Sequence, residues 1–273
     1  MGRNDLCFCG SGKKQKKCHS DIDCDSAFAK TIMFHNKADE IINENTQFDK
    51  LKCKKGCSEC CYQNFSISTV EFYYIMYQII NNQGIEKVRE YVKNGYEMWC
   101  EYEKEFPENA KLLKLNTESS NPNKFMEMMK VIEKSIEASP MFNKFPCPFL
   151  NVEEKSCDVY KDRPFVCRHF GIGYMEKHDL PVGFCSHTVD GTDYQQFMAD
   201  LRGLKDEAIE MDMYYSPKYN QSAYDRCYPI FYYCKITYEH FDNLEFKIKE
   251  RKDISKDKMS DNRLDRVIQR QRR

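Results

Sequence analysis

The spacing of its cysteines constrains this chain more than any other feature of the sequence. Most of them fall in three short segments: CFCGSGKKQKKCH at 7–19, CKKGCSECC at 53–61 and CPFLNVEEKSCDVYKDRPFVCRHF at 147–170. A dense cysteine pattern indicates metal binding where thiols stay reduced, and a disulfide scaffold where they are oxidised. The chain starts without an apolar signal sequence, and its 15 cysteines are an odd number. We therefore predict reduced thiols that bind metal in a cytoplasmic protein.

The first cysteine group has the pattern C-x-C-x8-C-H and consists of Cys7, Cys9, Cys18 and His19. Four nitrogen and sulfur ligands are what a tetrahedral structural zinc site requires. Gly-Ser-Gly at 10–12 permits a tight turn after the first pair, because glycine tolerates positive φ. A segment of about 20 residues has too little core to fold without metal. The pattern predicts a small zinc module over residues 1–22.

The second group has the pattern C-x3-C-x2-C-C and consists of Cys53, Cys57, Cys60 and Cys61. Adjacent cysteines rarely bind the same single ion, so this pattern indicates a cluster or two neighbouring metals. Four more candidate ligands follow downstream, at Cys147, Cys157, Cys167 and Cys185. The eight thiols could hold an iron–sulfur cluster, two zinc ions or a mixed iron site, and their spacing alone leaves these alternatives open.

Two weaker readings of this region stay open. The spacing of Cys53, Cys57 and Cys60 matches the cluster of radical-SAM enzymes, but helices rather than repeated β–α units are expected after it. His169 and His187 each follow a cysteine by two residues and are candidate ligands or acid–base groups. The sequence shows no nucleophile–base pair, so catalytic residues remain unassigned.

The remaining sequence predicts a mostly α fold. Apolar residues at helical spacing predict helices within 21–50 and over 68–84, 85–106, 123–139 and 193–215. Ser68 and Glu71 form a capping-box pattern, and Gly84 and Pro107 mark helix ends. The aromatic stretch 224–242 fits either a strand or a helix, and 140–190, with its five prolines, is expected to be irregular. We expect a helical domain with irregular cysteine-rich metal-binding segments, plus the small N-terminal module.

The segment RNDLCFCGSGKKQKKCH at 3–19 resembles the SEC-C motif, the small zinc module at the end of the SecA translocation ATPase and in many other proteins. This resemblance implies a structural zinc site that docks on a partner. In the SecA case the partners are a chaperone and the ribosome. We accordingly expect a protein or ribosome partner for residues 1–22.

CKKGCSECC, CPFL and C-x-VY-x2-RP-x2-CR-x-F, in this order over residues 53–185, are similar to the YkgJ-type cysteine-cluster family of zinc- or iron-chelating domains. Arg163, Pro164 and Arg168 fall on the family's RP and CR positions. The chain departs from the family by a helical insert over 85–139, which leaves room for a substrate or partner surface. The resemblance implies metal ligands at Cys53, Cys57, Cys60, Cys61, Cys147, Cys157 and Cys167, with Cys185 as an eighth.

These observations divide the chain into the module at 1–22, a chelating domain at 45–190, a helical and aromatic part of that domain at 191–250 and a basic tail at 251–273. Formal net charge is −1, with basic ends and an acidic body, so the basic tails are candidates for nucleic-acid contact. The longest apolar run, 72–80, is too short to cross a bilayer. The four cysteines outside both groups are expected in the core: Cys24, Cys100, Cys227 and Cys234.

We therefore predict a metal-binding protein with zinc in the module and zinc, iron or an iron–sulfur cluster in the second site. The second site has more thiols than one structural zinc ion needs, which could support redox or protein-modification chemistry. Alternatives are a non-catalytic adaptor and a protein that stores or delivers metal. Flagellin lysine N-methylase has a similar cysteine cluster and represents a third alternative, although the chain shows no Gly-rich nucleotide-binding loop.

Overall fold

The computed structural model describes residues 2, 4–20, 22–45, 56–63, 65–118, 145–171, 174–175, 181–182, 199–201, 204 and 228–239. The predicted helix at 123–139, most of the helix at 193–215 and the basic tail at 251–273 lie outside these residues. The candidate ligands Cys53, Cys185 and His187, and the candidate core residue Cys227, also lie outside the described residues.

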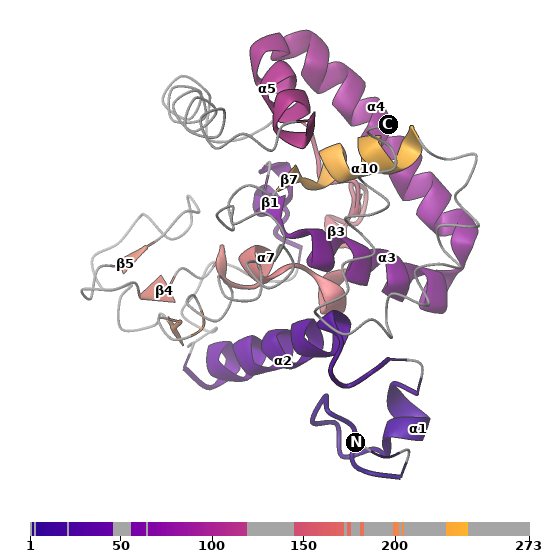
Figure 1. The fold of residues 1–273 in the computed structure, drawn as a ribbon. Helices are drawn as coiled ribbons and strands as arrows, with labels where there is room; N and C mark the ends of the chain where they lie inside the picture. The colour runs from indigo at the N-terminus through magenta and orange to yellow at the C-terminus, as the bar shows by residue number, and fades with distance from the viewer. Residues whose placement is uncertain are drawn as a thin grey trace.

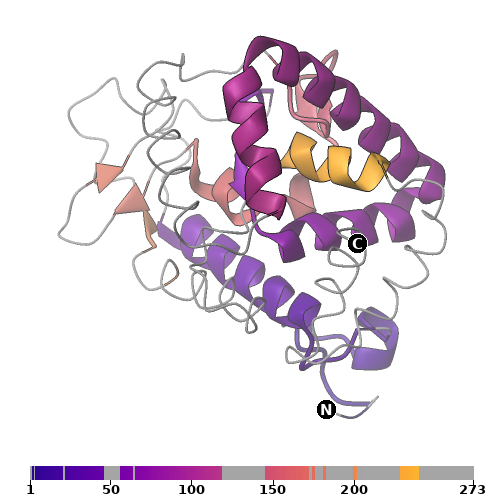
Figure 2. The ribbon, with the colours of Figure 1, turned by 45° about the horizontal axis from the view of Figure 1, so that its top comes forward.

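Helices dominate the described residues, which confirms the mostly α class. The longer ones are α2 (Ala27–Asn45), α3 (Thr69–Gln83), α4 (Ile85–Glu105), α5 (Pro107–Glu118) and α10 (Ile230–Tyr238). Short helical turns are α1 (Gln15–Cys18), α7 (Phe165–His169), η2 (Glu59–Tyr62) and η3 (Tyr160–Asp162). α10 lies inside the bend formed by α3, α4 and α5, and α2 lies between this group and the N-terminal module (Figures 1 and 2).

The strands are two-residue pairs that tie distant segments together. β1 (Ser66–Ile67) pairs antiparallel with β7 (Tyr228–Pro229), and β2 (Leu150–Asn151) pairs antiparallel with β3 (Ser156–Cys157). β4 (Tyr174–Met175) pairs antiparallel with β5 (Pro181–Val182) and parallel with β6 (Ala199–Asp200). The first pair joins the start of α3 to the start of α10, which lie more than 150 positions apart in the sequence.

The capping box at the start of α3 is confirmed. The Ser68 hydroxyl accepts a hydrogen bond from the Glu71 amide at 3.3 Å, and a Glu71 carboxylate oxygen accepts one from the Ser68 amide at 3.1 Å. Gly84, with φ 86°, then separates α3 from α4, a backbone conformation that only glycine adopts readily. Both ends of α3 are therefore set by local sequence.

The helix end predicted at Pro107 is confirmed, since α4 ends at Glu105 with Phe106 as its C-cap. Pro107 itself begins α5, where its fixed φ suits the first helical position and its missing N–H costs nothing. One expectation about secondary structure is wrong, because the helix predicted over 193–215 is contradicted at Ala199–Asp200, which forms β6 beside β4. Pairing with a distant strand overrides the local helical pattern there. The ambiguous stretch 224–242 contains both structures, with β7 leading directly into α10.

The core sits where α4 crosses α10. Trp99 of α4 is 2% exposed and stacks on Phe231, while its ring centroid lies 4.8 Å from that of Tyr232. Tyr91 of the same helix donates a hydrogen bond to the Asp158 carboxylate at 2.7 Å and packs on Phe149. The buried face of α4, in the first part of the insert, is thus core and supports the cysteine-bearing segment 147–158.

Replacing Gly95 by alanine should destabilise the fold by about 3 kcal/mol, because the new methyl group would overpack the core. A Cβ at this position would lie 2.4 Å from Cys234 Cβ and 3.2 Å from Pro148 Cγ. Helix propensity alone predicts the opposite sign, a gain of about 1 kcal/mol. Urea denaturation should show the loss in Gly95→Ala, while Asn94→Ala, at the exposed neighbouring position, should be neutral or stabilising. Unchanged stability of Gly95→Ala would contradict the close packing.

No helix among the residues the structure describes is long and apolar enough to span a membrane. The described cysteines form no disulfide with one another. Cys234 is buried as expected, whereas Cys24 and Cys100 are only half-buried.

Candidate metal centres

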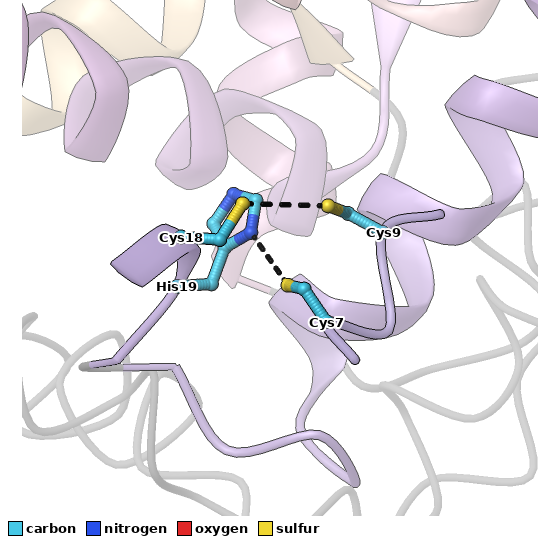
Figure 3. A group of neighbouring side chains, drawn as sticks. All are labelled: Cys7, Cys9, Cys18 and His19. Carbon is cyan, nitrogen blue, oxygen red and sulfur yellow. Dashed lines mark hydrogen bonds between the residues drawn. The ribbon is translucent and has the colours of Figure 1, made fainter. Parts of the chain in front are cut away.

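The N-terminal module brings four predicted ligands together. The ligand atoms of Cys7, Cys9, Cys18 and His19 all lie within 4.8 Å of one another. Figure 3 shows them pointing at a common centre, with Cys7 Sγ 3.2 Å from His19 Nδ1 and Cys9 Sγ 3.6 Å from Cys18 Sγ. Three thiols and one imidazole at these separations fit a tetrahedral zinc ion.

Backbone turns, rather than a hydrophobic core, place these ligands. The Cys7 amide donates to the Lys13 carbonyl at 2.8 Å, which closes the loop between the first ligand pair and α1. Gly10 and Gly12 have φ of 76° and 71°, so the predicted glycine turn is confirmed. The Gln15 side-chain amide donates to the carbonyls of His19 at 2.5 Å and Ile22 at 3.1 Å, and thereby fixes the end of α1.

The module rests on α2. The Asn36 side-chain amide donates to the Cys9 carbonyl at 2.7 Å, and Phe8 and Cys9 pack against the main hydrophobic core. Desolvation raises the pKa of the Cys7 thiol to about 12. Desolvation acts in the same direction on Cys9, but hydrogen bonds from Ser11 outweigh it and lower the pKa of that thiol overall. The module's thiols therefore differ in how readily they release a proton to an incoming metal.

A second group of six thiols lines one cavity of about 710 Å³, which we call the thiol cavity. The thiols come from four separate segments: the turn around η2, the loop before β2, β3 and α7. A hydrogen bond of 2.6 Å from the Cys147 amide to the Cys61 carbonyl joins the first two segments. The six residues are Cys57, Cys60, Cys61, Cys147, Cys157 and Cys167.

The arrangement of these six thiols differs from that of the module. Among the residues the structure describes, no three of their sulfur atoms lie within 4.8 Å of one another. Sulfur ligands of one zinc ion lie about 3.8 Å apart, since each Zn–S bond is about 2.3 Å. Soft thiolate donors fit zinc and iron, and their spread around a large cavity fits a centre broader than one ion.

The thiols of the cavity differ in acidity. A hydrogen bond with Cys61, together with the positive charge of Arg163, outweighs desolvation and lowers the pKa of the Cys60 thiol to about 7. Desolvation raises the pKa of Cys147 to about 12 and that of Cys157 to about 11. Desolvation also raises the pKa of Cys167. Cys60 is therefore better able than Cys147, Cys157 or Cys167 to start metal binding near neutral pH.

In reduced, metal-free protein at pH 7, we expect iodoacetamide to alkylate Cys60 well before Cys147 or Cys157, because the thiolate is the reactive form. Peptide mass spectrometry would follow each site in one sample. The Cys60 rate should fall about fivefold between pH 7 and pH 6, as its thiolate fraction falls. Equal rates at the three sites would contradict the acidity order.

A buried polar network positions α7, which carries Cys167. One Glu71 carboxylate oxygen accepts hydrogen bonds from the Phe165 amide at 2.7 Å and from His35 Nε2 at 3.2 Å. Hydrogen bonds from His35, Phe165 and Ser68 outweigh desolvation and lower the pKa of Glu71, whereas desolvation dominates at His35 and lowers its pKa. The structure thus gives Glu71 a second role beyond its helix cap.

Arg168 joins the same network. It donates from Nε to the Arg163 carbonyl at 3.0 Å and from Nη2 to the Lys161 carbonyl at 2.9 Å, and it forms an ion pair with Asp39 of α2. The arginine of the CR pair is therefore a buried structural anchor, not part of a solvated basic rim. His169, a candidate ligand, is buried with its ring centroid 4.8 Å from that of Phe165 and is not among the residues that line the thiol cavity.

Sequence reasoning missed two residues of this network, His35 and Asp39. Neither stands in a recognisable pattern, and only the contacts of His35 with α3 and of Asp39 with α7 reveal them. The predicted ligands Cys53 and Cys185 lie outside the described residues, so the structure places six of the eight proposed thiols at the cavity.

Comparison with protein families agrees with both resemblances. Residues 3–21 match the SEC-C motif, and residues 52–186 match the CxxCxxCC family, described as "putative zinc- or iron-chelating domain". No curated protein and no solved structure is significantly similar to the chain. The family matches indicate metal binding by zinc- or iron-chelating residues, and they leave the choice of metal open.

Proposed function

We propose that this chain, whose residues 3–21 match the SEC-C motif and whose residues 52–186 match the zinc- or iron-chelating family, carries two metal centres of different kinds. Cys7, Cys9, Cys18 and His19 would bind one structural zinc ion. The thiols of the cavity, with Cys53 and Cys185, would bind a zinc or iron centre of more than one metal atom.

The observation that carries this proposal is the convergence of six thiols on one cavity. They come from segments up to about a hundred residues apart in the sequence, and the core formed by α3, α4 and α10 holds those segments in place. A single structural zinc ion needs four ligands, so six thiols exceed that requirement. Bridging thiolates let one set of cysteines serve two or more metal atoms.

The proposal is tested by removing thiols one at a time. We expect Cys157→Ser and Cys167→Ser to lose metal from the cavity while the module keeps its zinc. Elemental analysis of the full-length, desalted protein gives the metal content per chain. Cys100→Ser is the matched control, since Cys100 is half-buried on α4 and does not line the cavity. Full metal content in both cavity variants would contradict a metal centre at this place.

Such a centre could support redox or modification chemistry, or it could store and deliver metal. Six thiols beside a cavity of about 710 Å³ favour a centre with room for a further ligand over a closed structural site. Visible absorption of the purified protein distinguishes an iron–sulfur centre from a zinc centre, because iron–sulfur clusters are coloured and zinc thiolates are not. Reversible bleaching by dithionite would support redox chemistry, and a colourless protein would contradict it.

For the module we propose docking on a protein or ribosome partner. Four exposed lysines and Leu6, which is 66% exposed, lie on residues 6–17 and offer a mixed basic and apolar surface. We expect salt-dependent co-sedimentation with purified ribosomes. Co-sedimentation should be lost when the four lysines of the module are changed to glutamate, and it should be kept when Lys87 and Lys93 on α4 are changed to glutamate instead. Sedimentation unaffected by the module changes would contradict this docking mode. The four lysines are Lys13, Lys14, Lys16 and Lys17.

A further inference from the structure

The thiol cavity has an uneven distribution of charge. Its described lining contains four basic side chains, Lys155, Lys161, Arg163 and Arg168, but no aspartate or glutamate. Metal binding turns thiols into thiolates, so a centre held by six or more of them carries net negative charge. Charges in a partly buried site interact strongly because water screens them poorly. The basic side chains of the lining are therefore candidates to offset that charge.

Three of these four residues are poorly suited to this task. Arg168 already pairs with Asp39 and two backbone carbonyls. Lys155 and Lys161 are exposed, where solvent and salt weaken their effect on the cavity. Arg163 alone among the four is half-buried and lacks a carboxylate partner among the described residues.

The guanidinium group of Arg163 stacks on an aromatic ring of the cavity lining and has one unpaired donor within the described part of the chain. Its guanidinium carbon lies 3.9 Å from the ring centroid of Tyr160, which also lines the cavity, so the planar group stacks on the aromatic face. Its Nε is buried and has no hydrogen-bond acceptor among the described residues. Two carboxylates of the same chain segment are engaged elsewhere, since Asp158 accepts a hydrogen bond from Tyr91 and Asp162 accepts one from Tyr74. An unpaired buried donor beside several thiols points to an anionic group in the cavity.

We propose that Arg163 provides the positive charge that stabilises the thiolate–metal centre of the cavity and thereby determines how tightly metal is retained. This inference rests on the proposed function of the same site. Arg163 acts on the ligands through its charge and is not itself a ligand.

The test compares metal release from full-length wild type, Arg163→Gln, Arg163→Lys and Lys155→Gln. Each metal-loaded protein is mixed with excess chelator, and release from the cavity is followed separately from release by the module, which acts as an internal reference. We expect release about 10-fold faster in Arg163→Gln, a typical effect of losing a group that supports metal ligands. Arg163→Lys keeps the charge and should recover most of the retention, while Lys155→Gln should resemble wild type.

The outcomes separate the inference from the proposed function. If the wild-type cavity holds no metal, the proposed function fails. If it holds metal but Arg163→Gln releases it at the wild-type rate, the inference fails alone. Failure of Arg163→Lys to restore retention would also overturn a charge role and indicate a purely structural one. The metal-free forms of the three variants should unfold at the same urea concentration as metal-free wild type, and a large loss in Arg163→Gln alone would likewise contradict the inference.

Discussion

Replacing Cys18 by serine should release one zinc ion per chain and unfold residues 4–20, while the helical core stays folded. In this segment Cys7 and Gln15 are the only buried residues, so hydrophobic burial can supply little of the folding free energy. For peptides of this size, structural zinc contributes about 10 kcal/mol or more, and a missing ligand forfeits most of it. The effect on the module should therefore be all-or-none.

Trypsin digestion measures this unfolding directly, because Lys13, Lys14, Lys16 and Lys17 lie inside the module. Cleavage there should be slow in wild type and rapid in Cys18→Ser. The core should lose only about 1 kcal/mol of stability, corresponding to the hydrogen bond from Asn36 to the Cys9 carbonyl. Ser11→Ala is the matched control, since Ser11 Oγ lies 3.4 Å from Cys18 Sγ but is not a ligand. Retained zinc and protection in Cys18→Ser would contradict the proposed ligand set.

Replacing Glu71 by alanine should destabilise the core by about 3–5 kcal/mol, the usual loss when one partner of a buried charged network is removed. The Glu71 side chain is 12% exposed and joins α3 to α2 through His35 and to α7 through the Phe165 amide. The substitution leaves these donors buried without an acceptor. Urea denaturation of the metal-free protein would measure the loss without a contribution from bound metal.

Two variants calibrate this result. Glu90→Ala removes an exposed carboxylate paired with Lys87 and should change stability by less than about 1 kcal/mol. Glu71→Gln keeps one acceptor oxygen but faces the Ser68 amide with a donor, so its loss should be intermediate. A loss in Glu71→Ala no larger than that in Glu90→Ala would contradict the network.

The same network predicts acid sensitivity. The folded-state pKa of His35 is lowered, so its contribution to stability is present above the unfolded value of about 6.5 and declines as pH falls below it. The pKa of Glu71 is also lowered, so its contribution is lost below about pH 4.3, the unfolded value for glutamate. The loss of stability between pH 7 and pH 4 should be smaller in His35→Gln than in wild type.

Local chemistry made part of this structure predictable. The ends of α3 follow from Ser68, Glu71 and Gly84, because caps depend on residues close in sequence. The four ligands of the module lie within 13 positions, so their spacing alone indicated that they meet. The family matches agree with what the cysteine patterns implied about metal binding.

Other features depend on contacts between distant segments. The Phe165 amide meets Glu71 across 94 positions, and no local pattern of either residue indicates that contact. The strand at 199–200 forms only because β4 lies beside it, and the same residues read locally as helix. The second thiol group was visible in the sequence as a set of cysteines, but the half-buried Arg163 in the same cavity lining, with its Nε unpaired among the residues the structure describes, became apparent only from the structure.

The central claim is that one chain holds two metal centres, of which the second contains more than one metal atom. Anaerobic purification followed by analysis of zinc, iron and acid-labile sulfide per chain tests it most directly. We expect one zinc ion for the module plus at least two further metal atoms, about three or more per chain in total. A total of one metal atom per chain would contradict a second centre, and a total of two would contradict its polynuclear character.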